Sequence, residues 1–207
     1  MVARGIFLLL AGPTATGKTV VLSRLLARSK GLLKDVSVTT RPPREGERDG
    51  LDYHFWELAR FERAAANGEF LEHALVHGLH RYGTLKAQVQ GQLEQGVDVI
   101  KDMDVQGVSQ VRKVLPYPAS VSVFMLPPSK EVLLARFNQR GAGDAENLAR
   151  RLQSAKKEIE RVEEYDYLLF NLDIEQVVED LQSVRRAEHL RCWRRASEAK
   201  ELWLKNL

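Results

Sequence analysis

Short apolar runs bounded by turn residues recur along the chain and predict buried strands. The predicted strands are Ile6–Leu10, Val97–Asp102, Val121–Leu126 and Tyr167–Phe170. Between and after these runs, apolar residues recur with the period of a helix. The predicted helices are Lys18–Ala27, Val105–Val114, Glu131–Gln139, about Ala145–Glu164 and Ile174 onward. Strands that alternate with helices predict an α/β fold, in which a parallel sheet carries helices on both faces.

The segment Thr39–Phe55 breaks this alternation, because prolines and glycines are spaced among its charged residues. We expect turns and short antiparallel strands here, as an insert in the main sheet. Two further short helices are expected at Phe61–Asn67 and Lys86–Glu94. The segment Gly141–Asp144 interrupts the helical pattern and predicts a mobile loop.

Composition and charge narrow the function classes. The chain has 207 residues, of which 44% are hydrophobic and 29% charged, as in an ordinary soluble globular protein. No apolar run approaches the length of about 20 residues that spans a bilayer, so no membrane segment is expected. A net charge of +3 does not require a nucleic-acid partner, and we expect none. The only cysteine, Cys192, excludes an intrachain disulfide and fits a reducing, cytoplasmic setting.

A phosphate-binding motif lies between the first predicted strand and the first predicted helix. Its residues are Gly12, Pro13, Thr14, Ala15, Thr16, Gly17, Lys18 and Thr19, which fit the pattern G-x-x-x-x-G-K-[ST]. The backbone N–H groups of such a loop, together with the helix N-terminus, bind phosphate. The Lys18 ammonium can reach the β- and γ-phosphates, and the Thr19 hydroxyl can ligate Mg²⁺. The motif therefore predicts a site for a nucleoside triphosphate, bound as MgATP.

A second phosphate site is suggested by two arginines. Arg41 and Arg44 stand three residues apart and are stiffened by the two prolines between them. Such a pair can bind one phosphate with both guanidinium groups, and Tyr53 and Tyr82 can add hydroxyl donors. Taken alone, the two arginines are more typical of a solvated loop.

The motifs between about Ile6 and Leu181 resemble, in order and spacing, those of the guanylate kinase family. Besides the phosphate loop, the matching blocks are Ser37–Phe55, Phe70–Ala74, Tyr82–Thr84, Asp102–Gly107, Pro127–Ser129, Arg136–Gly141, Arg151–Leu152, Tyr165–Tyr167 and Asn171. The resemblance implies a kinase that transfers the γ-phosphoryl group of ATP to GMP or dGMP in purine nucleotide metabolism. It also implies one domain in parts: a core of residues 1–34, 97–139 and 165–190, a GMP-binding insert of 35–96, and a lid of 140–164.

The resemblance also implies roles for individual residues. The guanine base is assigned to Ser37, Glu72, Thr84 and Asp102, and the GMP phosphate to Arg41, Arg44, Tyr53 and Tyr82. Arg136, Arg140 and Arg151 are expected to meet the transferring phosphate with Lys18 and the two insert arginines, while Arg140 and Asn171 bind ATP. Carboxylate acceptors and hydroxyl donors suit the N1–H, N2–H and O6 groups of guanine, whereas adenine presents the opposite pattern.

Several positions depart from the pattern of the family. Ala15 stands where the family usually has glycine, Asp35 replaces a serine, and Lys101 replaces an apolar residue beside Asp102. The usual acidic run of the lid is replaced by Ala142–Ala145. A C-terminal extension of residues 188–207 is expected to form a basic amphipathic helix, solvated or packed on the protein itself.

Two other functions stay open, and a homo-oligomer is compatible with the sequence. One is a guanylate kinase-like module without catalysis that binds a phosphorylated partner, and the intact Lys18 and Thr19 count against it. The other is a kinase for a phosphorylated sugar, which would not need the residues assigned to the guanine base.

Overall fold

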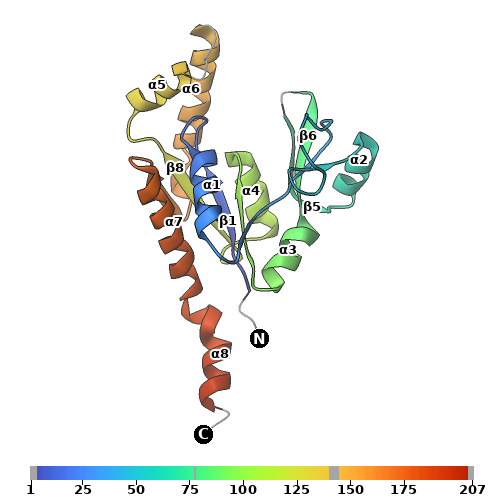
Figure 1. The fold of residues 1–207 in the computed structure, drawn as a ribbon, viewed down its shortest axis with the longest axis vertical. Coiled ribbons are helices and arrows are strands. Elements are labelled where there is room, and N and C mark those ends of the chain that lie inside the picture. Colours follow the sequence, from blue (N-terminus) through green and yellow to red (C-terminus); the bar gives the residue numbers. More distant parts are fainter. Residues whose placement is uncertain (1–3, 77, 140–144, 205–207) are drawn as a thin grey trace.

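A computed structural model describes residues 4–76, 78–139 and 145–204, which form two sheets and their helices (Figure 1). The main sheet has five parallel strands in the order β2-β7-β1-β8-β9. These strands are β1 (Phe7–Ala11), β2 (Leu32–Lys34), β7 (Asp98–Asp102), β8 (Ser120–Leu126) and β9 (Tyr167–Phe170). The predicted parallel sheet is confirmed. The sequence missed β2, because a run of three residues is too short to show a strand period.

Helices cover both faces of the main sheet, as predicted. They are α1 (Lys18–Arg28) and α7 (Ile174–His189) on one face, and α3 (Lys86–Glu94) and α4 (Val105–Val114) on the other. Along β1, Leu8 and Leu10 pack into the core of the first face, while Phe7 and Leu9 pack into that of the second. Because both faces are covered, every residue of β1 is buried, and the strand reads as an unbroken apolar run.

The second sheet has four strands in the order β4-β3-β6-β5 and stands beside the main sheet (Figure 1). Its elements are β3 (Val38–Thr39), β4 (His54–Phe55), α2 (Leu58–Ala66), β5 (Phe70–Val76) and β6 (His80–Leu85). The predicted antiparallel pairing within Thr39–Phe55 is wrong, since β3 pairs with β4 in parallel. The long loop between them returns the chain to the same end of the sheet. The antiparallel partner of β3 is β6, far along the chain, so the segment belongs to a separate sheet.

Two helices stand at the upper end of the main sheet in Figure 1, α5 (Lys130–Gln139) and α6 (Ala145–Ile159). The predicted helix that continues to Glu164 is wrong at its end. The helix stops at Ile159, and a short 3₁₀ turn, η1 (Val162–Glu164), leads the chain into β9. The predicted mobile loop Gly141–Asp144 lies outside the described residues.

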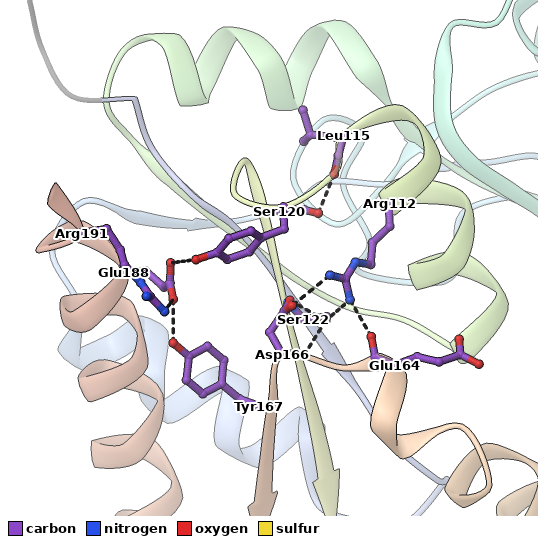
Figure 2. Close-up of polar contacts among 10 residues, drawn as sticks. Arg112, Leu115, Ser120, Ser122, Glu164, Asp166, Tyr167, Glu188 and Arg191 are labelled. Carbon is purple, nitrogen blue, oxygen red and sulfur yellow. Dashed lines mark hydrogen bonds and ion pairs between the residues drawn. The ribbon is translucent and has the colours of Figure 1, made fainter. Parts of the chain in front are cut away.

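A polar network fixes the start of β9 on β8 (Figure 2). The Asp166 carboxylate accepts hydrogen bonds from the backbone N–H and the hydroxyl of Ser122, both at 2.8 Å. It also pairs with Arg112 at 2.9 Å, and Arg112 donates to the Glu164 carbonyl at 2.6 Å. The Tyr165–Tyr167 motif of the sequence therefore contains a structural aspartate, at the end of the sheet opposite the phosphate loop.

The C-terminal helix α8 (Cys192–Leu204) follows α7 and extends away from the sheets (Figure 1). Just before it, the buried Glu188 accepts a hydrogen bond from the Tyr167 hydroxyl at 2.6 Å (Figure 2). Arg194 of α8 donates to the carbonyls of Arg4 and Pro118, at 2.9 and 2.6 Å. A helix is present in the extension as predicted, but it begins at Cys192 rather than at 188, since α7 continues to His189, and none of its residues is buried. Within the described ranges, no helix is both long and apolar enough to cross a membrane.

Asp98, at the start of β7, is expected to be the carboxylate on which stability depends most. Its side chain accepts from the Ile6 backbone N–H at 2.7 Å, from His189 Nε2 at 2.8 Å and from Arg185 Nε. Burial opposes its ionisation, but the hydrogen bonds from His189 and Arg185 outweigh burial and hold the pKa of Asp98 below its ordinary value. Asp98→Asn should lower the free energy of unfolding by about 3 kcal/mol, measured by thermal or urea denaturation, because it removes the buried negative charge that pairs with Arg185 and His189.

The pH dependence of this effect has a definite sign. Since the pKa of Asp98 is lower in the folded state, its contribution is complete above the unfolded pKa of about 3.9 and is lost as the pH falls through the folded pKa. The stability difference between wild type and Asp98→Asn should therefore shrink on acidification below about pH 4. Glu179→Gln, at an exposed position of α7, is the matched control, and an equal loss there would contradict the role of Asp98.

Candidate active site

The carboxyl ends of β1 and β7 lie side by side, because the strand register pairs Leu10 with Asp102. The backbone N–H of Met103 continues this contact by donating to the Leu10 carbonyl at 3.1 Å. The phosphate loop begins just after β1, and Asp102 is the last residue of β7. Open α/β sheets bind their ligands at this edge. One residue assigned to the base thus lies next to the loop assigned to the triphosphate.

Two glycines give the phosphate loop its shape. Gly12 and Gly17 have φ angles of 137° and 98°, a region that disfavours L side chains. A Cβ atom on Gly12 would lie 2.1 Å from the Met125 carbonyl oxygen, and one on Gly17 would lie 2.5 Å from Asn171 Nδ2. Only glycine fits at these two positions. Helix α1 then begins at Lys18, so its N-terminal N–H groups open onto the loop.

Side chains from the loop itself and from two distant segments meet at the loop backbone. Lys18 Nζ donates to the Pro13 carbonyl at 3.0 Å and also to that of Gly12. The Thr16 carbonyl accepts from Asn171 Nδ2 at 2.7 Å and from Arg136 Nη1 at 3.1 Å. The structure therefore brings Arg136 and Asn171 to the loop, while their expected contacts with nucleotide stay predictions.

Ala15 joins the phosphate loop to the helices above it. Its φ angle is 66°, and it is the one described residue other than glycine with a positive φ. This conformation costs an L-residue about 1–2 kcal/mol. The Ala15 methyl is buried in a small core with Leu133, Phe137 and Ala155 of α5 and α6, and that burial offsets part of the cost.

The arginines predicted to bind the transferring phosphate from the lid differ in their contacts: of the two that the structure describes, Arg136 and Arg151, only Arg136 donates a hydrogen bond to the phosphate loop. The Arg151 guanidinium lies over the Phe137 ring, 5.9 Å from its centroid, within the α5–α6 pair, and its expected contact with the transferring phosphate stays a prediction. Arg140 lies outside the described residues.

Sequence reasoning missed Glu158 of α6. Burial raises the pKa of this carboxyl, although the hydrogen bond from Ser154 and the positive charge of Lys18 oppose the change. Helix α6 approaches the phosphate loop, since Ala155 packs in one small core with Ala15.

Arg41 is held by an acidic partner that the sequence analysis did not identify. Its Nη2 atom lies 2.8 and 2.9 Å from the two carboxylate oxygens of Glu47. The hydrogen bonds between them raise the pKa of Arg41 and lower that of Glu47. The guanidinium also lies 5.4 Å from the centroid of the Tyr53 ring, which meets the Tyr82 ring edge-on. Three of the residues assigned to the GMP phosphate therefore form one cluster.

Arg44 joins this cluster through its backbone alone. Its N–H donates to Glu47 at 2.7 Å, while its side chain is exposed. The sequence does carry a signal for Glu47, since an R-x-x-R-x-x-E pattern places one carboxylate after two arginines. This signal is weak, because charged residues fill the whole segment.

A cavity of about 280 Å³ opens between the two sheets. Its lining includes Asp35, Ser37, Tyr53, Glu72, Tyr82, Lys101 and Asp102. Most of the residues assigned to GMP are thus gathered around one space. Thr84 is fully buried behind Glu72, and its hydroxyl donates to Glu72 Oε1 at 2.5 Å. Its direct contact with the base stays a prediction.

Lys101 places a positive charge inside this cavity. Its Nζ atom lies 2.9 Å from Asp35 Oδ2, 2.8 Å from Ser37 Oγ and 3.3 Å from Glu72 Oε1, and it also donates to the Thr84 hydroxyl. Burial opposes the charged form, but the two carboxylates raise the pKa of Lys101 above its ordinary value. The lysine is therefore charged at neutral pH.

Comparison with known proteins gives a consistent result. A family model described as Guanylate kinase matches residues 5–188. The guanylate kinase of Hahella chejuensis is 47% identical over 189 residues, which cover 91% of this chain and 89% of that protein. The guanylate kinase of Alkalilimnicola ehrlichii is 44% identical over 187 residues, covering 90% and 91%. A crystal structure of guanylate kinase from Anaplasma phagocytophilum superposes with a TM-score of 0.74 at 31% identity, covering 98% of this chain and 96% of that one.

Proposed function

This chain belongs to the guanylate kinase family, and we propose that the phosphate loop and the cavity divide its two substrates between them. The enzyme transfers the γ-phosphoryl group of ATP to GMP, giving ADP and GDP. In our proposal the loop holds the triphosphate, the cavity holds guanine, and the cluster around Arg41 holds the GMP phosphate. One observation carries this division: the pairing of Leu10 with Asp102, which sets the two regions at neighbouring strand ends.

On the donor side, we propose that ATP binds as its magnesium complex. Thr19 is exposed in the first turn of α1, and its hydroxyl is a ligand of the kind Mg²⁺ accepts beside substrate phosphates and water. Lys18 exchanges its carbonyl partners for phosphate oxygens, and Arg136 approaches from α5. Catalysis then consists of positioning and charge neutralisation. No general base is needed, because a phosphate monoester with a second pKa near 6 is mostly ionised at neutral pH.

On the acceptor side, Arg41 changes partner. In the structure, both carboxylate oxygens of Glu47 lie against one guanidinium nitrogen, Nη2, while Nη1 donates to the Pro42 carbonyl, and phosphate oxygens are acceptors of the same kind. We propose that the GMP phosphate replaces Glu47 or shares the guanidinium with it. The rings of Tyr53 and Tyr82 limit the movement of Arg41 during this exchange.

The acceptor class is tested by ADP release in a coupled assay with GMP, dGMP, AMP, UMP and ribose bisphosphate. We expect GMP and dGMP to be turned over and the other three acceptors to be much poorer. A preference for ribose bisphosphate would favour the sugar-phosphate kinase, and no ADP release with any acceptor would favour the binding module.

Arg41→Ala is expected to lower kcat/KM for GMP about thirtyfold while the KM for ATP stays within about threefold. The reason is that the proposed contact reaches the acceptor phosphate and not the donor. Arg48→Ala removes an exposed arginine from the same segment and should change neither constant. Equal losses in the binding of guanosine and of GMP would show that Arg41 does not touch the phosphate.

We further propose that the enzyme acts in purine nucleotide metabolism in the cytoplasm. Its substrates are free nucleotides, and the reaction uses no membrane component. Cys192, exposed on α8, has no partner for an intrachain disulfide, in keeping with a reducing compartment.

A further inference from the structure

We propose that Lys101 is a positioning residue that sets base specificity, because it favours the Ser37 hydroxyl as a hydrogen-bond donor toward position 6 of the purine. This proposal rests on the assignment of the cavity to guanine. Lys101 lies at the next-to-last position of β7, beside Asp102, and its side chain is 10% exposed.

The hydrogens of the Lys101 ammonium are all committed to the protein. An ammonium group has three N–H donors and no acceptor. Asp35 Oδ2 at 2.9 Å, Ser37 Oγ at 2.8 Å and the Thr84 hydroxyl take one hydrogen each. Glu72, at 3.3 Å, adds charge attraction. Lys101 therefore acts on a bound base through its neighbours rather than by direct contact.

A hydroxyl that accepts a hydrogen bond from an ammonium directs its own hydrogen elsewhere. Thr84 directs its hydrogen to Glu72 Oε1 at 2.5 Å. Ser37 lines the cavity, and among the described residues no acceptor takes the hydrogen of its hydroxyl. That hydrogen therefore points into the space assigned to the base. Lys101 thus takes one of the two lone pairs of the Ser37 oxygen, and since the hydroxyl hydrogen has no acceptor among the described residues, Ser37 is favoured as a donor toward the base.

A donor at this place distinguishes purines by their substituent at position 6. Guanine presents the O6 acceptor there, whereas a 6-amino purine presents N–H donors. Without Lys101, the Ser37 hydroxyl is able to rotate and accept from an amino group. With Lys101 present, accepting from an amino group turns the hydroxyl hydrogen to a side where no described residue accepts it, and the amino purine is disfavoured.

The negative charge of Asp35 stabilises the buried ammonium group of Lys101. The Asp35 side chain is completely buried and pairs with Lys101, so the two residues add no net charge to the cavity. Lys101→Met alone would leave the Asp35 carboxylate buried without a cation. A useful test therefore removes both charges together, in the double variant Asp35→Asn/Lys101→Met.

The test compares kcat/KM for three acceptors that differ at one edge of the base. Inosine monophosphate lacks the 2-amino group of GMP, and 2,6-diaminopurine ribonucleoside monophosphate carries an amino group at position 6. In the double variant, the preference for GMP over the diaminopurine nucleotide should fall at least about tenfold. The preference for GMP over inosine monophosphate should stay within about threefold, since other atoms read position 2.

Lys30→Met serves as the matched control. It removes an exposed lysine between α1 and β2 that does not line the cavity, and it should leave both preferences unchanged. Thermal melts monitored by circular dichroism establish that each variant is folded. An unchanged GMP preference over the diaminopurine nucleotide in the folded double variant would overturn the proposal, as would equal changes in both preferences.

A mutant cycle tests whether Lys101 acts through Ser37. In a Ser37→Ala background, adding the Asp35→Asn/Lys101→Met pair should cause no further loss of discrimination at position 6. Additive losses would show that the lysine acts by another route and would overturn the proposal. A wild-type enzyme that prefers GMP over neither analogue would instead refute the guanine assignment, so the two failures are distinguishable.

Discussion

Replacing Lys18 with alanine is expected to lower kcat about a thousandfold while the affinity for GMP stays within about threefold. Lys18 lies in the phosphate loop, where its Nζ atom bonds the Gly12 and Pro13 carbonyls. In our proposal it stabilises charge on the phosphoryl group during transfer, and the variant without the ammonium loses this effect. GMP is assigned to a cavity built from other segments. Steady-state kinetics and calorimetric titration of GMP measure the two quantities separately.

Lys30→Ala is a suitable control, because it removes an exposed lysine shortly after α1. Its kcat should match that of the wild type. Near-normal turnover in a folded Lys18→Ala protein would contradict the role of the loop in phosphoryl transfer. A parallel loss of GMP affinity would show that the loop and the cavity do not bind their substrates separately.

The fold was predictable where burial leaves a local pattern in the sequence. Strands β1 and β8 lie between helices on both faces, so β1 reads as an unbroken apolar run and β8 as a mainly apolar one that Ser122 interrupts. The parallel pairing of β3 with β4 was not predictable from pattern, because each strand has only two residues. Their partners are set by the packing of the second sheet around Phe61 and Phe70.

The candidate site likewise has one part that the sequence predicts and one part that it does not. The phosphate loop is a local motif whose glycines fix the backbone, so its residues were identifiable one by one. The cavity draws residues from several segments, and its internal contacts depend on how the two sheets meet. Asp35 and Lys101 were visible as departures from the family pattern, but their ion pair needs the register of β2 on β7. The contact of Arg151 with Phe137 likewise depends on the packing of α6 on α5.

The second large effect is expected from Glu72→Gln, which should lower kcat/KM for GMP about a hundredfold. Glu72 Oε1 accepts from the Thr84 hydroxyl at 2.5 Å and faces Lys101 Nζ at 3.3 Å. Glutamine has one acceptor oxygen, which the Thr84 hydroxyl requires and the Lys101 charge attracts. The NH₂ group must then turn toward the cavity, where it meets the N1–H and N2–H donors of guanine. Measurement of kcat/KM for GMP, AMP and UMP in wild type and variant tests this expectation.

AMP and UMP should lose far less than GMP, because neither presents the pair of donors that the Glu72 carboxylate accepts. The preference for GMP over AMP should therefore shrink in the variant. Glu69→Gln, an exposed carboxylate just before β5, controls for the loss of one negative charge and should leave the preference unchanged. If all three nucleotides lose the same factor, Glu72 supports the cavity structurally and does not read the base. In that case its bonds with Thr84 and Lys101 would be the whole of its role.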